Sequence, residues 1–194
     1  EKLLDYGAKV VSLSDSSGTI HDKDGITREK LEFVKELKNV RYGRISEYAQ
    51  KYNVPFIEKS RPWSIACDIA FPSATQNELD ANDARALIAN GCICISEGSN
   101  MGSTPEAISL FKNARVLFGV SKAANAGGVA VSGLEISQNR MGYQWDRKDL
   151  DTRLRTIMKD IHSQCLEYGE EDGYVDYVKG ANVAGFDTGP GNCL

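Results

Sequence analysis

The 194-residue sequence predicts an α/β fold with a doubly wound, Rossmann-like parallel sheet. Two observations support this. Short apolar runs typical of strands alternate with longer runs of helical periodicity. In addition, polar residues directly follow three of the apolar runs, and their sequences are SDS (14–16), PSATQ (72–76) and EGSN (97–100). Because ligands bind at the carboxyl ends of the strands in such sheets, we expect these polar segments to form a nucleotide crevice.

The N-terminal third predicts two helices and short extended segments. Residues 1–7 have the pattern of an amphipathic helix end that a glycine closes, and residues 8–13 have the pattern of a strand. Thr27 opens a helix as its N-cap, and apolar residues follow it at helical spacing. A second helix is expected at 45–52 and an extended piece at 55–57.

The rest of the chain alternates more regularly. Buried strands are predicted for the apolar runs 67–72, 92–96 and 115–118. Thr104 and Pro105 open a helix, with proline at its first position. Further helices are predicted at 83–90, 130–139 and 150–167, with a shorter one at 172–179.

Composition and charge exclude several classes of function. The hydrophobic fraction of 41% and the charged fraction of 26% are ordinary for a globular protein. The net charge is −4 and the pI about 5.3, so we expect no nucleic-acid partner. No apolar run approaches the roughly 20 residues of a membrane span, so we expect no membrane partner. The first residues do not form a signal peptide, and we expect a cytoplasmic location.

The cysteines and histidines do not predict a metal site. The five cysteines are odd in number and include no C-x-x-C pair, and the two histidines share no ligand spacing. Buried reduced thiols are the favoured interpretation, and metal ligation is the alternative. The cysteines are Cys67, Cys92, Cys94, Cys165 and Cys193.

Asp15 is the candidate ligand of a dinucleotide. In a Rossmann unit, an acidic residue about 20 positions after the G-x-G-x-x-G turn bonds the adenosine ribose. Counting back from Asp15 by that distance passes Glu1, so we expect the phosphate-binding turn and the first strand upstream of this chain. The chain is then a fragment, or a variant without its first strand. The alternative is that Asp15 belongs to an ordinary D-S-S-G turn.

The run KAANAGGVAVSGLE at 122–135 is the most distinctive feature of the chain. Its small residues let a ligand approach the backbone, and a helix start after them favours an anion. Asn125 and Ser132 add hydrogen-bonding side chains. Together they suit a small substrate with a carboxylate. A tight helix-packing turn is the alternative interpretation.

This run resembles the glycine-rich substrate loop of the hexameric glutamate dehydrogenases. Other runs have counterparts in the same order, namely SDSSG (14–18), PSATQNEL (72–79), EGSNM (97–101) and GANVAGF (180–186). The resemblance implies an NADP-specific enzyme that interconverts glutamate with 2-oxoglutarate and ammonia and assembles as a homo-hexamer. It also implies a dinucleotide-binding domain at 1–172, incomplete at its N-terminus, and a segment at 173–194 that returns toward the substrate domain.

The resemblance assigns cofactor roles to particular residues. Lys38 and Arg44 would approach the 2′-phosphate of NADP, with Ser14 beside them. A basic helix end that complements the helix dipole is the alternative role for Lys38 and Arg44. The residues that would line the cofactor from adenosine to the nicotinamide ribose are Ala74, Thr75, Gln76, Gly98, Ser99 and Asn100.

The chain departs from the family pattern at two positions of the turn that follows Glu97. Ser99 stands where alanine is usual and Gly102 where proline is usual, and we expect both changes to loosen the turn. NADP is the expected cofactor, and NAD remains possible.

For the substrate, the resemblance implies that Ser132 binds the γ-carboxylate, Val129 packs against the substrate chain and Asn125 lies near the reacting end. The catalytic lysine and aspartate of the family belong to a preceding domain. We therefore assign no catalytic residue on this chain, Lys122 included, and expect the chain alone to be inactive.

Two alternatives remain open. One is an NAD-dependent or dual-specific glutamate dehydrogenase, and the other is a non-catalytic module that binds a dinucleotide or another subunit. The apolar character of Ala123, Ala124, Val129 and Val131 favours the enzyme. The ending DTGPGNCL (187–194) departs from the family, which continues as a helix, and we expect it to be disordered, truncated or altered.

Overall fold

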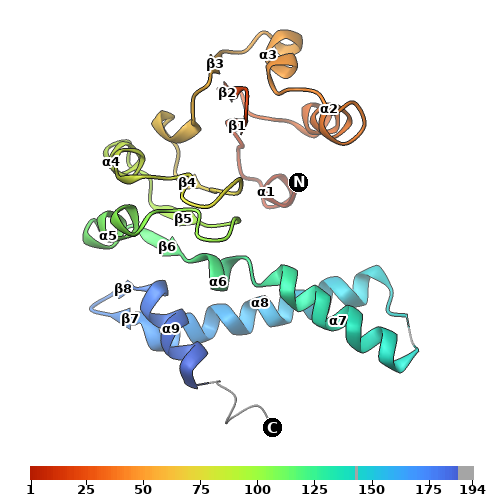
Figure 1. Cartoon of the computed structure of the whole chain (residues 1–194), viewed down its shortest axis with the longest axis vertical. Coiled ribbons are helices and arrows are strands. Elements are labelled where there is room, and N and C mark those ends of the chain that lie inside the picture. The colour runs from red at the N-terminus through yellow and green to blue at the C-terminus, as the bar shows by residue number, and fades with distance from the viewer. Residues whose placement is uncertain (143, 188–194) are drawn as a thin grey trace. The chain divides into compact units, whose positions relative to one another are not determined.

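The computed structural model describes residues 1–142 and 144–187 (Figure 1). The chain divides into two compact units, Glu1–Cys67 and Asp68–Leu194. The ending predicted to be disordered, truncated or altered is 187–194. Asp187 is the last described residue, and 188–194, Cys193 included, lie outside the described residues.

The first unit contains an antiparallel sheet in the order β1-β2-β3. Leu13 lies opposite Ile20, and Thr19 lies opposite Ile57. The elements are α1 (Lys2–Asp5), β1 (Ser12–Asp15), β2 (Gly18–His21), α2 (Arg28–Asn39), α3 (Ser46–Tyr52), β3 (Phe56–Glu58) and a 3₁₀ turn, Pro62–Ser64. The helices predicted from Thr27 and at 45–52 are confirmed, and Thr27 accepts a hydrogen bond from the Lys30 backbone N–H at 3.3 Å.

The β1–β2 hairpin differs from the prediction of a strand at 8–13. The segment before Ser12 is no strand because the Val10 and Val11 carbonyls accept from the loop N–H groups of Ile26 and Asp22. The chain then reverses into β2 through Gly18, whose φ of +149° favours glycine. A Cβ at Gly18 would also overlap the Ile57 carbonyl oxygen of β3, so this close strand pairing requires glycine.

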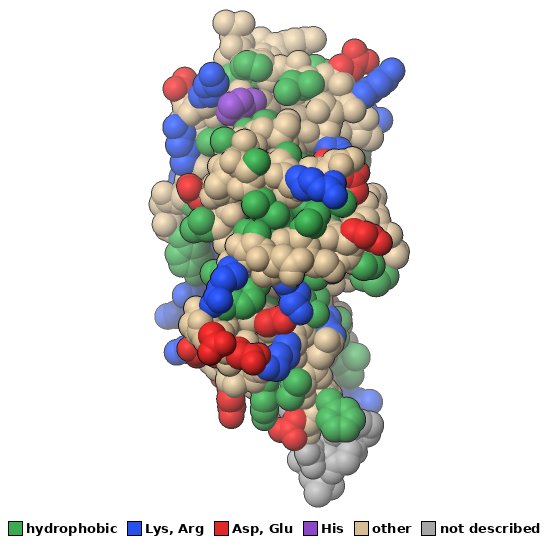
Figure 2. Space-filling model, turned by 90° about the vertical axis from the view of Figure 1, so that its left-hand side faces the viewer, with side chains coloured by type: hydrophobic (Ala, Val, Ile, Leu, Met, Phe, Trp, Pro, Cys, Tyr) green, Lys and Arg blue, Asp and Glu red, His purple; other side chains and the backbone are tan. Residues whose placement is uncertain are grey.

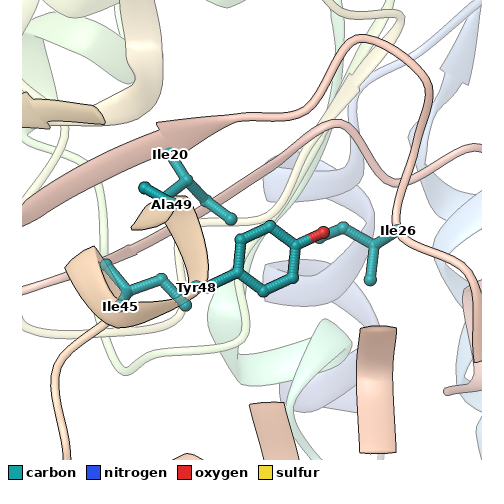
Figure 3. Close-up of a cluster of buried hydrophobic side chains, with 5 residues drawn as sticks. All are labelled: Ile20, Ile26, Ile45, Tyr48 and Ala49. Atoms are coloured by element: carbon teal, nitrogen blue, oxygen red, sulfur yellow. The ribbon is translucent and has the colours of Figure 1, made fainter. Parts of the chain in front are cut away.

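The core of the first unit surrounds Tyr48, whose ring lies in the middle of the cluster drawn in Figure 3. Asp22 is also buried, with 1% of its surface exposed. Its Oδ2 accepts from the Tyr48 hydroxyl and from Lys30 Nζ, each at 2.6 Å. Burial raises the pKa of the Asp22 carboxyl, but the hydrogen bonds from Lys30 and Tyr48 outweigh it and hold this pKa below its ordinary value. The other cluster members are Ile20, Ile26, Ile45 and Ala49.

The second unit contains the predicted parallel sheet, in the order β4-β5-β6, and confirms the α/β fold. Ile95 in the central strand lies between Ala70 and Phe118. Figure 1 shows α7 and α8 lying against each other as two long helices. The elements are β4 (Ile69–Ala70), α4 (Ala81–Ala89), β5 (Cys94–Ser96), α5 (Pro105–Asn113), β6 (Leu117–Gly119), α6 (Ser121–Ala124), α7 (Gly127–Met141), α8 (Arg147–Gly169), β7 (Glu170–Glu171), β8 (Tyr174–Val175) and α9 (Tyr177–Asp187).

Helix boundaries in this unit follow their capping residues. Thr104 caps α5, as predicted, and accepts from the Ala107 N–H at 3.3 Å. Helix α4 begins at Ala81, earlier than the predicted 83, because Asp80 and Asp83 form a reciprocal capping box.

The predicted helix at 172–179 is wrong. Asp172 and Gly173, both with positive φ, turn the chain between β7 and β8, and α9 starts only after them. Asp176 then caps α9, and its Oδ1 accepts from the N–H groups of Val178 and Lys179, each at 3.0 Å.

Helices α8 and α9 approach each other closely at Gly180, part of the GANVAGF run. A Cβ there would overlap the Cys165 carbonyl oxygen of α8. We expect Gly180→Ala to lower the free energy of unfolding by about 1–3 kcal/mol, measured by chemical denaturation. Gly185→Ala is the matched control in the same helix, because a Cβ at Gly185 would meet nothing within 4 Å. Equal stability of the two variants would contradict the packing role of Gly180.

Figure 2 shows basic and acidic side chains interspersed with hydrophobic ones on the face it presents. Among residues 1–142 and 144–187, no helix combines the length and apolarity needed to cross a membrane.

Candidate functional site

Asp15 is the centre of a hydrogen-bonded cluster in the first unit. Its Oδ1 accepts from the Ser17 N–H at 2.9 Å and from the Ser17 hydroxyl at 2.6 Å. Its Oδ2 accepts from Lys38 Nζ at 2.7 Å and from the Ile45 N–H at 2.9 Å. The carboxylate thus joins the hairpin turn, the end of α2 and the start of α3.

The Asp15 carboxylate is saturated by these contacts. Its side chain is 12% exposed, and each oxygen already accepts two hydrogen bonds. Burial raises the pKa of Asp15, but the hydrogen bonds from Lys38, Ser17 and Ile45 hold it well below its ordinary value. A ribose hydroxyl would have to displace one of these partners. We call these four contacts of Asp15 the clamp. The alternative of a D-S-S-G turn anticipated the contacts with Ser17, whereas the contacts with Lys38 and Ile45 were missed.

Arg44 and Ser14 are exposed near this cluster. Arg44 Nη1 donates to the Ser16 hydroxyl at 2.6 Å, so the guanidinium lies beside the hairpin turn. Lys38 is half-buried and donates to Asp15 and to the Gly43 carbonyl oxygen at 3.0 Å. Two of its three N–H groups are thus used within the unit. Arg44 is therefore the more accessible of the two predicted phosphate ligands.

In the second unit, the loops after β4 and β5 are bonded to each other. The Pro72 carbonyl oxygen accepts from the N–H groups of Gly98, at 2.8 Å, and Ser99, at 3.1 Å. The Ser99 hydroxyl reaches the same oxygen at 3.3 Å and the Thr75 carbonyl oxygen at 3.4 Å. The prediction that Ser99 loosens this turn is wrong, because its hydroxyl adds contacts across the two loops. A Cβ at Gly102 would lie 2.6 Å from the Ser99 hydroxyl oxygen, so the absence of a side chain at Gly102 makes room for this hydroxyl.

The predicted cofactor residues of this unit are largely open to solvent. Glu78 Oε2 accepts from the N–H groups of Ala74 and Thr75, each at 3.0 Å, and fixes the backbone after β4. Ser99 is half-buried, and the exposed members are Ala74, Thr75, Gln76, Gly98 and Asn100.

The predicted substrate residues lie on α7 and on the turn before it. Asn125 Nδ2 donates to Asn100 Oδ1 at 2.7 Å, which joins the predicted substrate and nicotinamide segments. Val129 is 78% exposed. The exposed Ser132 donates to the Gly128 carbonyl oxygen one turn back, at 3.2 Å. Lys122 Nζ donates to Asn182 Oδ1 of α9.

Sequence reasoning also missed Glu97, which is 1% exposed and bonded to the backbone of two loops. The available signal was an acidic residue directly after a buried strand, at the sheet edge where ligands bind.

Among the cysteines of the described residues, Cys92 and Cys165 are buried and Cys67 and Cys94 are partly exposed. Burial raises the pKa of the Cys94 and Cys165 thiols. Within 1–142 and 144–187, no group of three His, Cys, Asp or Glu residues could hold a metal ion.

Comparison with known proteins identifies the family. A model of glutamate/leucine/phenylalanine/valine dehydrogenases matches residues 1–188. The chain belongs to this family. Similar members include a glutamate dehydrogenase of Bacteroides thetaiotaomicron, 58% identical, and an NAD(P)-specific one of Xylanibacter ruminicola, 56% identical. An NADP-specific glutamate dehydrogenase of Salmonella typhimurium is 52% identical.

The match covers nearly all of this chain and less than half of each of these relatives. It includes 96% of the chain but only 42% of the length of these three relatives. The crystal structure of glutamate dehydrogenase from Plasmodium falciparum superposes with a TM-score of 0.90 at 45% identity, over 96% of this chain and 41% of that one. The likeness of fold supports a Rossmann-like architecture.

Proposed function

We propose that the complete protein is an NADP-dependent glutamate dehydrogenase and that this chain is its coenzyme-binding part. The reaction would convert L-glutamate to 2-oxoglutarate and ammonia, or run in reverse. The observation that carries the proposal is the continuous match to relatives named glutamate dehydrogenases, at 52–58% identity over 96% of the chain. When bound, the nicotinamide supplies the acceptor or donor of a hydride.

The 2′-phosphate of NADP would bind at Arg44, with Ser14 and Lys38 beside it. A guanidinium bonds phosphate oxygens bidentately, and Arg44 is exposed. The negative charge of Asp15 favours an unphosphorylated ribose only while it is uncompensated. Here Lys38 pairs with it at 2.7 Å, so the repulsion of a phosphate is weakened. We therefore propose that Asp15 supports the cofactor site by holding its loops, and that its ribose contact is secondary.

The second unit would hold the remainder of the cofactor and the substrate. The exposed backbone of Ala74, Thr75 and Gln76 fits a ligand lying along it, and Gly98, Ser99 and Asn100 would contact the nicotinamide ribose. For glutamate, Ser132 would bind the γ-carboxylate, Val129 would pack its chain and Asn125 would lie near the reacting carbon. What supports this is that Asn125 and Asn100 are directly bonded.

The chain by itself is expected to be inactive, because in the family the catalytic lysine and aspartate belong to the preceding substrate domain. In this proposal, residues 1–172 belong to the dinucleotide-binding domain, and 173–194 begin the segment that returns toward the substrate domain. A homo-hexamer and a cytoplasmic location remain predictions from the family resemblance.

Arg44→Ala tests the cofactor assignment in the complete protein. We expect the KM and Kd for NADP(H) to rise about tenfold or more, because a charge-assisted contact to phosphate is lost, with NAD(H) little changed. Arg41→Ala is the matched control, since Arg41 is on the same loop but pairs with Glu47. The readouts are glutamate-dependent dinucleotide reduction and dinucleotide binding by fluorescence. Equal loss for both dinucleotides would favour the NAD form, and an inactive complete protein would favour the non-catalytic module.

A second candidate is a dual-specific enzyme. The Xylanibacter ruminicola relative, 56% identical, is named NAD(P)-specific. The engagement of Lys38 with Asp15 also reduces the positive charge available to a phosphate. Comparable kcat/KM for NADP and NAD in the unsubstituted protein would favour this alternative.

A further inference from the structure

We infer that Glu97 is a positioning residue, which fixes the loop assigned to the nicotinamide ribose against the segment assigned to the substrate. The inference rests on the proposed function, and all the residues involved lie in the second unit. They belong to the end of β5, the loop 98–103 and the segment 120–125.

Glu97 connects these segments by its side chain. Oε1 accepts from the Ser103 N–H at 2.7 Å, and Oε2 accepts from the Ser121 N–H at 2.8 Å. The Glu97 N–H donates to the Gly119 carbonyl oxygen at 3.0 Å, so the residue is also fixed to β6. Glu97 has 1% of its surface exposed, and it is held by two hydrogen bonds to its side chain and one from its backbone.

The loop that Glu97 holds is strained and is supported from both sides. Met101 has φ of +50°, which is uncommon for a residue with a side chain. Its N–H donates to the Ser121 hydroxyl at 3.2 Å, and its carbonyl oxygen accepts from the Asn77 N–H at 2.8 Å. Such a conformation persists only where its surroundings determine it. Ser121 therefore takes part twice, through its N–H and through its hydroxyl.

The two connected segments carry the two predicted ligand groups. Asn100 lies in the first and Asn125 in the second, and they are bonded at 2.7 Å. Reactive atoms must be held about 3–3.5 Å apart, and a misplacement of about 1 Å can cost about 100-fold in rate. A residue that sets the separation of these loops would therefore affect the chemical step more than the binding of either ligand.

The carboxyl group is matched to this task because it offers one acceptor to each of two N–H donors. Glutamine would direct an NH₂ group at one of them, so one hydrogen bond would be replaced by opposed donors. Aspartate is one methylene shorter and could not reach both. We therefore expect Glu97→Gln and Glu97→Asp both to release one loop.

The test is Glu97→Gln in the complete protein. We expect kcat to fall about 10- to 100-fold, with the Kd for NADPH changed less than about threefold. The deuterium isotope effect on kcat with 2-deuterated glutamate should rise, because hydride transfer becomes the slow step. Independently of turnover, amide hydrogen exchange should become faster at Ser103 or at Ser121, whichever faces the new NH₂ group.

Asp176→Asn is the matched control. Asp176 is also a carboxylate that accepts two backbone N–H groups, but it caps α9. Asparagine keeps Oδ1 as the cap but loses the ion pair of Oδ2 with Lys112. We therefore expect lower stability, with unchanged kcat, isotope effect and exchange at Ser103 and Ser121. If Glu97→Gln behaves like this control, the inference is overturned, as it is if exchange at Ser103 and Ser121 stays slow.

If Glu97→Gln does not fold, Ser121→Ala decides the question. It removes only the hydroxyl that accepts from Met101, so a smaller fall in kcat with unchanged NADPH affinity is expected, and no fall overturns the inference. Absence of glutamate-dependent turnover in the unsubstituted protein would instead refute the proposed function. The exchange rates at Ser103 and Ser121 would still test whether Glu97 fixes the two segments.

Discussion

Replacing Asp22 with alanine is expected to lower the free energy of unfolding by about 3 kcal/mol, at the lower end for a broken buried ion pair. The change leaves the Lys30 ammonium and the buried Tyr48 hydroxyl without their shared acceptor. Lys30 is 19% exposed and recovers some hydration, whereas the Tyr48 hydroxyl lies within the apolar cluster of Figure 3. Chemical denaturation measures the loss.

Asp24→Ala is the control on the same loop. Asp24 is exposed, and its backbone N–H, which donates to Asp22, survives the substitution. Its effect should stay within about 0.5 kcal/mol. If both variants lose equally little stability, the buried network does not stabilise the unit.

The same group predicts a dependence on pH. The pKa of Asp22 is lowered by folding, so the native state binds the proton less readily than the unfolded state. The stabilisation is complete above the unfolded pKa of about 3.9, declines below it, and is lost once the pH has passed through the folded pKa. The stability difference between the unsubstituted protein and Asp22→Asn should therefore shrink below about pH 4. A difference that stays constant would mean that the charge of Asp22 contributes nothing.

Local signals in the sequence were sufficient to predict many of the helices and strands of the second unit. The cap Thr104 followed by proline correctly predicted that α5 starts at Pro105, and buried apolar runs predicted the parallel strands around Ile95. The β1–β2 hairpin was missed because it depends on the φ of Gly18 and on β3 contacting it from about 40 residues away, which periodicity does not encode.

The candidate site also has one part that the sequence could predict and one that it could not. The order of polar segments after the strands predicts which loops would carry ligands, and this assignment stays a prediction. The partners of the acidic side chains were not predictable, because Asp15 bonds Lys38 across 23 positions and Glu97 bonds Ser121 across 24. A motif shows that an acidic residue is present, whereas tertiary contacts decide whether its oxygens face a ligand or the protein backbone.

Replacing Asp15 with asparagine distinguishes these two roles. We expect the free energy of unfolding to fall by about 2 kcal/mol. The ion pair with Lys38 is lost, and so are the hydrogen bonds accepted by the oxygen that the NH₂ group replaces. Binding of NADP(H) should weaken more than that of NAD(H), because the loop that carries Arg44 is released from the hairpin turn and only NADP(H) has the 2′-phosphate that Arg44 would contact. The measurements are denaturation and the Kd for each dinucleotide in the complete protein.

Asp5→Asn is the control, since Asp5 forms an exposed pair with Arg28 in the same unit, and such pairs contribute little to stability. If Asp15 acts mainly as a ribose ligand, Asp15→Asn should weaken binding while stability matches that of Asp5→Asn. If Asp15 instead holds the loops together, Asp15→Asn should lower stability more than Asp5→Asn does, and the loss of affinity should result from that change. These contacts also explain how an aspartate at this position is compatible with a phosphorylated cofactor. The negative charge of Asp15 is compensated by Lys38 and by the backbone N–H groups that it accepts from, such as that of Ile45.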